Sequence, residues 1–419
     1  MIHRKIRKSI LAVVLLFLFI QLVTAQEKNV DYFVNLALQN SPLLKDYQGR
    51  LQFNRIDSLR LRAGLGAQVN AFSNNSYAPV INGIGYDEAI TNGANVYAAV
   101  SVSKGIISKK NLQNQLQAVD LQKQTILNPA KISEQDIRKN VIDQYITVYG
   151  LLQQVKFFGE ELDLLHKEEI IFKKLTSTGV YKQTEYLTFL VLLQQQDLQL
   201  AQLSNQYRNA FRSLHYLCGV VDTATYPLAF PALRLEKLPM LQNSIFYQQF
   251  VTDSLNLVIS NKQIDYNYQP KLNLFGEAGF NSSMAYQPWK NFGPNFGLNL
   301  SVPIYDGHQK RMQHDQITVS EQTRKYYREF FTWQYGQQIN QLLLQLTDVQ
   351  NLGGRIRKQI TYSQALVDAN RKLLETGGVS VTEFIIAMSN LLTTKNMLLQ
   401  NEIEKYQLIN QLNYWCREK

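Results

Sequence analysis

Histidines and carboxylates are the residues of this chain that could support acid–base or metal chemistry. Beyond the first 25 residues, the histidines are His166, His215, His308 and His314. A zinc hydrolase would need two histidines four residues apart with a glutamate after the first, and no HExxH spacing occurs. His308 and His314 are six residues apart beside Asp315, which is too loose a spacing for a metal site. We interpret the histidines as solvated helix residues.

Motifs for covalent catalysis or phosphate binding are also missing. The sequence contains no GxSxG motif and no glycine-rich phosphate loop. The basic residues are scattered, and no basic cluster interleaved with aromatic residues indicates a nucleic-acid groove. The sequence therefore predicts a protein that is not an enzyme, uses no cofactor or metal, and binds no nucleic acid.

A repeated stretch indicates which elements position the remaining polar residues. The segment LTSTGVYKQTEYL at 175–187 returns as LLETGGVSVTEFI at 373–385, and an offset of 198 residues aligns ten identical pairs. So many identities at one offset predict a duplicated unit of about 200 residues. We expect repeats at 26–225 and 240–419, joined by a proline-containing connection at 226–239.

The first 25 residues have the composition of a secretory signal peptide. Four basic residues precede the apolar run Ile10–Ile20, and the small-residue sequence VTA precedes Gln26. The run is shorter than the roughly 20 residues that cross a bilayer, which disfavours a retained anchor. No cysteine follows the cleavage site, so no lipid anchor is expected. Without these four positive charges, the formal net charge falls from +10 to +6.

Each repeat should contain one very long helix. Apolar residues recur at spacings of three and four from Ile137 to Val155, and again from Leu342 to Val367. Helix breakers are scarce around both seams, and Pro129 is the strong exception. At about 1.5 Å per residue such helices reach on the order of 100 Å. The heptad spacing and the length predict a coiled-coil body rather than a globular domain.

Each Thr-Gly pair is predicted to form the tip of an antiparallel helix pair. Gly179 and Gly377 can adopt the positive φ that ends a helix. The expected tip turns and the helices that follow them are 178–180 with 184–217 and 376–378 with 382–415. Cys218 and Cys416 end these second helices. We interpret both as small apolar residues, and a disulfide between them stays open as the alternative.

Alternating apolar and polar residues predict two β-hairpins. The strands are expected at about 66–74 with 94–102 and at about 271–280 with 295–302. Strands of this length, apolar on one face, fit a transmembrane β-barrel, although a soluble four-stranded sheet is the alternative. The export signal and the long helices favour the barrel. The smallest single-chain barrels use about eight strands, so we expect a trimer to supply twelve.

The order helix, hairpin, long helix, Thr-Gly tip and helix, present twice, resembles the TolC-like outer-membrane factors. These are the exit ducts of Gram-negative efflux pumps and type I secretion systems. VPIYDGHQKR at 302–311 is similar to the strand-to-helix signature of the family. The first copy, VSKGIISKK at 102–110, lacks the proline and the acidic turn. The resemblance extends over the whole mature chain.

The resemblance implies a mainly α-helical chain with a transmembrane β-barrel portion. A homotrimer would form a 12-stranded barrel in outer-membrane lipid and an α-helical tunnel across the periplasm. The tunnel would meet a periplasmic adaptor (membrane fusion) protein and, through it, an inner-membrane transporter. The implied function is the passive exit duct of a tripartite efflux pump. A type I protein secretion channel and a periplasmic coiled-coil scaffold without a pore are the alternatives.

The resemblance also implies two sets of functional residues. The adaptor-docking tip would consist of Thr178, Gly179, Val180, Thr376, Gly377, Gly378 and Val379. Glu185 and Glu383 would form an acidic ring at the tunnel mouth, although Ile386 stands where a second acid is expected. From the residues alone, Ser380 and Glu383 have the spacing of a capping box. The two interpretations of Glu383 are compatible, and both stay open.

Overall fold

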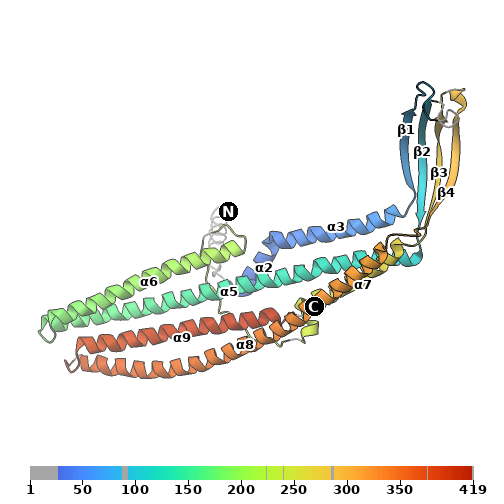
Figure 1. Cartoon of the computed structure of the whole chain (residues 1–419). Helices are drawn as coiled ribbons and strands as arrows, with labels where there is room; N and C mark the ends of the chain where they lie inside the picture. The colour runs from blue at the N-terminus through green and yellow to red at the C-terminus, as the bar shows by residue number, and fades with distance from the viewer. Residues whose placement is uncertain are drawn as a thin grey trace, which may run out of the picture. The chain divides into compact units, whose positions relative to one another are not determined.

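The two halves of the chain contain the same order of elements. The computed structural model describes residues 27–86, 93–222, 224–238, 240–284, 287–374 and 376–417, so the predicted signal peptide at 1–25 lies outside the described residues. The first half contains α2 (Val30–Asn40), α3 (Pro42–Gly64), β1 (Gln68–Tyr77), β2 (Ala94–Ile106), α5 (Lys109–Ser177) and α6 (Gln183–Leu217) (Figure 1). The second contains η1 (Leu241–Asn243), α7 (Ile245–Asn267), β3 (Lys271–Ser282), η2 (Pro288–Lys290), β4 (Phe292–Ser301), α8 (Gln309–Leu374) and α9 (Val381–Trp415).

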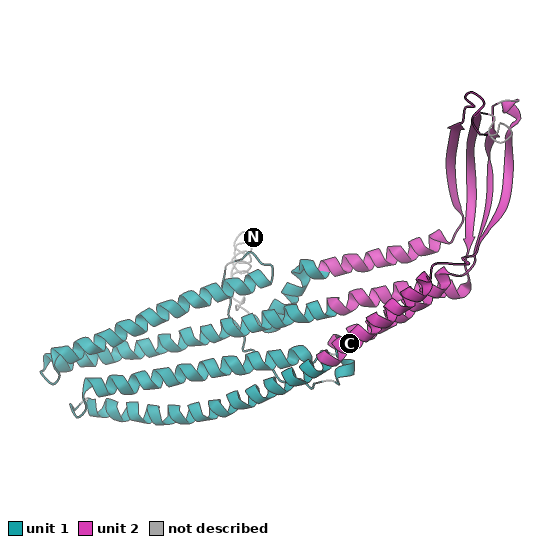
Figure 2. Cartoon of the chain, in the orientation of Figure 1, with its two compact units in different colours: residues 1–44, 131–245, 332–419 teal, residues 45–130, 246–331 magenta. Residues whose placement is uncertain are grey.

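The chain forms two compact units, and each half contributes to both (Figure 2). Unit 1 takes its described residues from Met1–Leu44, Lys131–Ile245 and Thr332–Lys419. Unit 2 consists of Lys45–Ala130 and Phe246–Phe331. Unit 1 therefore contains both tip turns, and unit 2 contains the four strands.

The helices form where the sequence has long heptad seams and few breakers. Helices α5 and α8 have 69 and 66 residues, and α6 and α9 have 35 residues each. Val141, Tyr145 and Val148 of the first predicted seam are buried, as are Leu342 and Leu346 of the second. The seam predictions are confirmed for these residues. None of the described helices is both long and apolar enough to cross a membrane.

The N-terminal segment is fixed to the connection between the two halves. Lys28 pairs with Leu228 in a parallel bridge, and its N–H donates to the Pro227 carbonyl at 2.9 Å. The buried Tyr145 hydroxyl lies 2.9 Å from the Lys28 carbonyl oxygen and 2.5 Å from that of Ala229. Helix α5 therefore holds the start of the described chain and the start of the second half together.

The strands form one antiparallel sheet in the order β1-β2-β3-β4. The hairpins expected in the two halves correspond to β1 with β2 and to β3 with β4, and β2 joins the halves by pairing with β3. Strand β4 ends before Pro303, which cannot donate to a ladder. The first copy has Ser103 instead, so β2 continues to Ile106, beyond the expected end at 102.

Candidate functional site

The two tip turns are Schellman motifs. In the first, the Val180 N–H donates to the Leu175 carbonyl at 3.0 Å and the Gly179 N–H donates to the Thr176 carbonyl at 3.1 Å. The equivalent bonds of the second turn are 2.9 and 3.2 Å long. Gly179 and Gly377 have φ of +80° and +73°, where only glycine avoids a steric cost. The sequence prediction of two equivalent helix ends agrees with this geometry.

The threonine before each glycine closes the same turn. The Thr178 hydroxyl donates to the Leu175 carbonyl at 3.0 Å, and the Thr376 hydroxyl donates to the Leu373 carbonyl at 2.9 Å. Both hydroxyls satisfy carbonyls that the end of a helix leaves without a helical partner. The exposed tip residues are Thr178, Gly179, Val180, Thr376, Gly377 and Gly378.

The two tips of the chain contact each other through Tyr181. Its hydroxyl donates to the Leu374 carbonyl at 2.7 Å and lies 3.1 Å from the Val379 carbonyl oxygen. Burial, and to a lesser extent the charge of Glu185, raises the pKa of Tyr181, so the hydroxyl keeps its proton. A methyl group built on Gly377 would touch a methyl group of Val180 at 3.4 Å. The two turns therefore form one continuous surface.

The expectation that Val379 is an exposed tip residue is wrong. Its side chain is half-buried and packs against a core cluster that both hairpins share. In this cluster the ring centroid of Phe172 lies 4.6 Å from that of Phe189 and 6.1 Å from that of Phe384. Val381, two residues further on, is fully buried in the same cluster.

Two ion pairs join the hairpins behind the tips. Arg371 Nε lies 2.8 Å from Glu168 Oε1, and the Glu168 side chain is only 7% exposed. Lys395 Nζ lies 2.9 Å from Glu161 Oε1. A buried carboxylate without its partner would be strongly unfavourable, so the first pair makes the relative position of α5 and α8 specific.

Glu383 and Glu185 both lie at helix N-termini. The Glu383 carboxylate accepts the Ser380 N–H at 3.0 Å, and the Ser380 hydroxyl accepts the Glu383 N–H at 3.2 Å, which completes the predicted capping box. The Glu185 carboxylate accepts the Lys182 N–H at 3.0 Å. Lys182 has no side-chain acceptor, so only half of the box exists at this end, and the Glu185 N–H instead donates to the Lys182 carbonyl.

The contacts of Tyr181 and the missing cap at Lys182 were not predicted from the sequence. At the offset of 198, Tyr181 aligns with Val379 and Lys182 aligns with Ser380. Most aligned positions differ between the repeats, so the difference at these two positions does not by itself identify them.

The sheet of unit 2 is the second candidate functional surface. Its register places apolar side chains together on one face, including Val69, Val96, Val100, Leu272, Leu274, Phe280, Phe296, Leu298 and Leu300. The opposite face carries mostly polar ones, including Asn70, Asn74, Tyr97, Ser101, Glu277, Asn281, Asn295 and Asn299. On this face the Asn295 amide donates to Glu277 at 2.6 Å.

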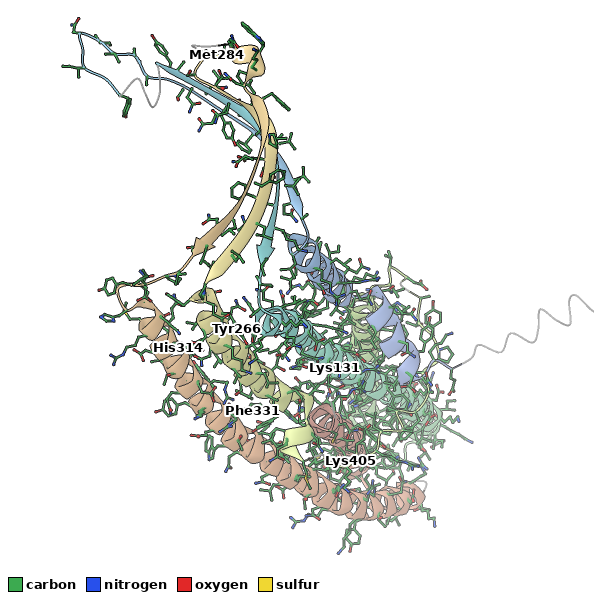
Figure 3. All side chains as sticks on the ribbon, turned by 90° about the vertical axis from the view of Figure 1, so that its right-hand side faces the viewer. Lys131, Tyr266, Met284, His314, Phe331 and Lys405 are labelled. Atoms are coloured by element: carbon green, nitrogen blue, oxygen red, sulfur yellow. The ribbon has the colours of Figure 1, made fainter. Side chains whose placement is uncertain are left out.

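Both faces of the sheet are solvent-exposed in the single chain. Strand β1 is exposed at every residue, and β4 at all but Gly297. Figure 3 shows side chains projecting from the strands, with Met284 labelled in the connection between β3 and β4. Within the described residues, β1 pairs only with β2 and β4 only with β3, so each edge strand has one unpaired side.

The interpretation of the histidines as solvated helix residues is wrong for His215, which is buried at 3% exposure, and for His308, which lies in a turn before α8. His314 Nδ1 lies 2.7 Å from Asn261 Oδ1, and His314 Nε2 lies 3.4 Å from Asp265 Oδ1. Within the described ranges, no cluster of three or more His, Cys, Asp or Glu side chains could hold a metal ion. Cys218 and Cys416 are buried free thiols at the ends of α6 and α9, so the alternative of a disulfide between them is wrong.

The chain is similar to solved outer-membrane channels over nearly its whole length. No protein-family model matches the sequence, and a comparison with curated protein sequences finds no match. Solved structures do match. For CusC, whose structures concern transmembrane channel formation, the TM-score is 0.78 at 15% identity, covering 93% of this chain and 92% of that one.

Two further channels have similar scores. For the outer membrane protein VceC of Vibrio cholerae the TM-score is 0.77 at 11% identity, with coverage of 93% and 96%. For the MtrE outer membrane channel of Neisseria gonorrhoeae, solved in its open state, it is 0.72 at 12% identity, with coverage of 92% and 88%. The predicted resemblance to the TolC-like outer-membrane factors is thus confirmed at the level of the fold, and the chain has the fold of these outer-membrane channels.

Proposed function

We propose that this chain is one protomer of a homotrimeric outer-membrane exit duct for an efflux pump. The duct is passive, and an inner-membrane transporter supplies the energy through a periplasmic adaptor protein. The observation that carries the proposal is the sheet, which has one apolar face, one polar face and two half-paired edge strands. The fold shared with solved outer-membrane channels supports it.

The sheet supports a trimer because its edges cannot remain unpaired in lipid. Each unsatisfied backbone group in the hydrocarbon costs several kcal/mol, so a sheet there must close on itself. Four strands of 10 to 13 residues are long enough to span but too few to close. Three protomers supply twelve, with β4 of one pairing with β1 of the next and the apolar face toward lipid.

Aromatic side chains at one end of the sheet support placement in a membrane. Tyr77 at the end of β1, Trp289 before β4 and Phe292 at its start are each more than 70% exposed. Membrane barrels carry such aromatic residues at the boundary between hydrocarbon and headgroups. We therefore place this end at one interface of the outer-membrane bilayer.

The tip surface is the proposed docking site for the adaptor. Thr178, Gly179, Val180, Thr376, Gly377 and Gly378 are exposed there, and two turns per protomer would give six per trimer. Val379 belongs to the tip through its backbone, which lies next to the Tyr181 hydroxyl. Glu185 and Glu383 remain candidates for an acidic ring at the tunnel mouth, in addition to capping their helices.

The proposed chain organisation follows the repeats. Residues 1–25 are a signal peptide, 26–225 and 240–419 are the two repeats, and 226–239 connects them. Mass analysis of protein purified from the outer membrane should find Gln26 at the N-terminus. A mature chain that still contained residues 10–20 would contradict this processing.

The state of the protein in detergent tests the proposed duct. Membranes should release it only with detergent, as a trimer that migrates intact on a gel until it is boiled. In planar bilayers this trimer should form discrete channels. A water-soluble protein with its strand content intact would support the coiled-coil scaffold instead, and a stable monomer in detergent would contradict the shared barrel.

A further inference from the structure

The two tips have the same backbone conformation but differ at the residue just before the second helix. Lys182 precedes α6 with φ −76° and ψ 151°, and Ser380 precedes α9 with φ −75° and ψ 150°. Ser380 caps its helix with its hydroxyl, whereas the Lys182 side chain cannot accept a hydrogen bond. Serine is among the preferred residues at such a position, and lysine is not.

Lys182 is also unfavourable electrostatically. The N-terminus of a helix carries partial positive charge, which disfavours a cation there. The basic residues Lys173 and Lys174 end α5 on the other side of the same turn, where the helix dipole favours them. Lys182 thus adds a positive charge at the N-terminus of α6, where the helix dipole disfavours it. The Glu185 carboxylate, which accepts the Lys182 N–H, offsets part of this cost. A residue that breaks a local preference is nevertheless expected at functional positions.

The Lys182 side chain is exposed, and the backbone that carries it is held in place. The adjacent Tyr181 is buried and hydrogen-bonded to the second tip, so the backbone at Lys182 cannot move freely. The nearby ion pairs, Arg371 with Glu168 and Lys395 with Glu161, do not involve it. The exposed Lys182 side chain is therefore part of the accessible surface beside the two turns.

From this arrangement we infer that Lys182 is the contact residue for a carboxylate of the protein that docks on the tips. The inference rests on the proposed function, because it assumes that the tips are the docking surface. Charge complementarity indicates the partner's chemistry: an exposed aspartate or glutamate that reaches the first tip and not the second. The equivalent serine at the second tip, already engaged in its capping box, offers no such charge.

Substitution of Lys182 distinguishes a docking role from a folding role, because thermal stability and export are expected to change in opposite directions. Lys182→Ser copies the second tip on the same backbone, so thermal stability should stay equal or rise. Export, measured with a compound to which deletion of the gene sensitises the host, should fall. Three exposed ion pairs per trimer correspond to about a tenfold loss of partner affinity. Lys182→Arg keeps the charge and should keep export.

A matched control removes a neighbouring charge from the same tip. Lys173→Ser deletes one exposed lysine at the end of α5 and should leave export unchanged. If Lys173→Ser and Lys182→Ser reduce export equally, general positive charge and not a specific contact is responsible, and the inference is overturned. Retention of export in Lys182→Ser overturns it as well.

A water-soluble carbodiimide tests the contact directly. This reagent joins a lysine amine to a carboxylate as an amide, with loss of water, only when the two groups touch. In whole cells it should link Lys182 of the full chain to an aspartate or glutamate of a periplasmic protein, identified by peptide mass spectrometry. Lys182→Arg should abolish this link while preserving export. Lys182 linked only within its own trimer, or not at all, would overturn the inference.

A bulky residue at Val180 distinguishes failure of the inference from failure of the proposed function. Val180→Trp should block docking by shape, whatever the role of Lys182, and should leave the trimer intact. If Val180→Trp abolishes export and Lys182→Ser does not, the tip docks the partner but Lys182 is not the contact. If export survives both changes, the docking surface lies elsewhere and that part of the proposed function is wrong.

Discussion

At the residue scale, one hydroxyl group connects elements that are almost 200 positions apart in the chain. Tyr181 donates a second hydrogen bond to the Leu374 carbonyl at the end of α8, which also accepts the Gly377 N–H. The bond is buried, so water cannot replace it without opening the core behind the tips. Tyr181 thus adds a polar contact to the core and the ion pairs that join the two hairpins, and it has no counterpart in the second repeat.

Removal of the Tyr181 hydroxyl should loosen the tips. Tyr181→Phe removes one hydrogen bond from the Leu374 carbonyl, which keeps its bond from the Gly377 N–H, so we expect a loss of about 0.5–1.5 kcal/mol. We expect a lower unfolding temperature and faster amide hydrogen exchange at 376–380. Tyr186→Phe is the matched control, because that hydroxyl bonds the partly exposed Glu169. Equal effects of the two changes would contradict a special role for Tyr181.

The two tip glutamates can be tested for a role beyond capping. Glutamine closes a capping box about as well as glutamate but has no charge. The double variant Glu185→Gln and Glu383→Gln should keep its thermal stability and lose cation preference, measured as the reversal potential across a salt gradient. Alanine at both positions should lower stability by about 1 kcal/mol per cap. If the glutamine variant keeps its ion selectivity, these residues act only as caps.

The buried thiols should be almost unreactive. Burial raises the pKa of Cys218 to about 11, and burial followed by the charge of Glu236 raises the pKa of Cys416 to about 11. At pH 8 about one thiol in a thousand is then ionised, and the thiolate is the reactive form. Maleimide should label the unfolded chain at once and the native protein very slowly, at a rate that rises with pH. An added cysteine at the exposed position 180 provides the positive control.

The sequence predicted the residues with local roles and missed those with distant partners. Gly179 and Gly377 could be placed because a helix end needs positive φ locally. Glu383 could be identified as a cap because Ser380 lies three residues before it. The capping role of Glu185 was not predicted because a lysine precedes its helix. The contacts of Tyr181 were not predicted because its partners lie in the other repeat. No local pattern contains such information.

At the element scale, Gly279 has no room for a side chain between β3 and β2. A Cβ atom there would lie 2.3 Å from the Ala98 carbonyl oxygen and 2.4 Å from the Ala99 Cα. These are backbone atoms of β2, so a rotamer change cannot relieve the contact. Gly293 pairs with Gly279 across β3 and β4, but a Cβ atom there would meet nothing within 4 Å.

This difference between paired glycines gives a test of the sheet. Gly279→Ala should force β2 and β3 apart and reduce the yield of boil-sensitive trimer. Gly293→Ala should be tolerated, because its Cβ atom has room. Trimer yield on unboiled gels and strand content by circular dichroism measure both. Equal trimer yields from the two variants would contradict the register of the sheet.

Elements were predictable where one periodicity dominates. The helices at 183–217 and 381–415 begin within one residue of the expected positions, because a glycine turn and a Leu-rich seam define them. The end of β2 was misjudged by four residues, because the alternation weakens after Val102. Pairing with β3 supplies the hydrogen bonds that carry β2 on to Ile106. Tertiary pairing of this kind overrides local strand preference.

At the scale of the whole molecule, neither half can form a unit alone. Both units take segments from both halves of the chain. Residues 26–225 or 240–419 expressed separately should therefore yield no trimer and no cooperative unfolding. A protease cut within 226–238 of the assembled protein should leave the trimer intact, because packing holds the halves together. A native trimer from one half would contradict this view.

The pairing of β2 with β3 also affects how the protein is made. When β2 has left the ribosome, its second partner begins only after all of α5, α6 and α7. At ordinary synthesis rates of about 5–20 residues per second, the edge of β2 waits on the order of ten seconds. During this interval an apolar hairpin with an open edge can aggregate. Biogenesis should therefore require a periplasmic chaperone that holds the first hairpin, and its depletion should lower the amount of this protein before that of barrels built from consecutive hairpins.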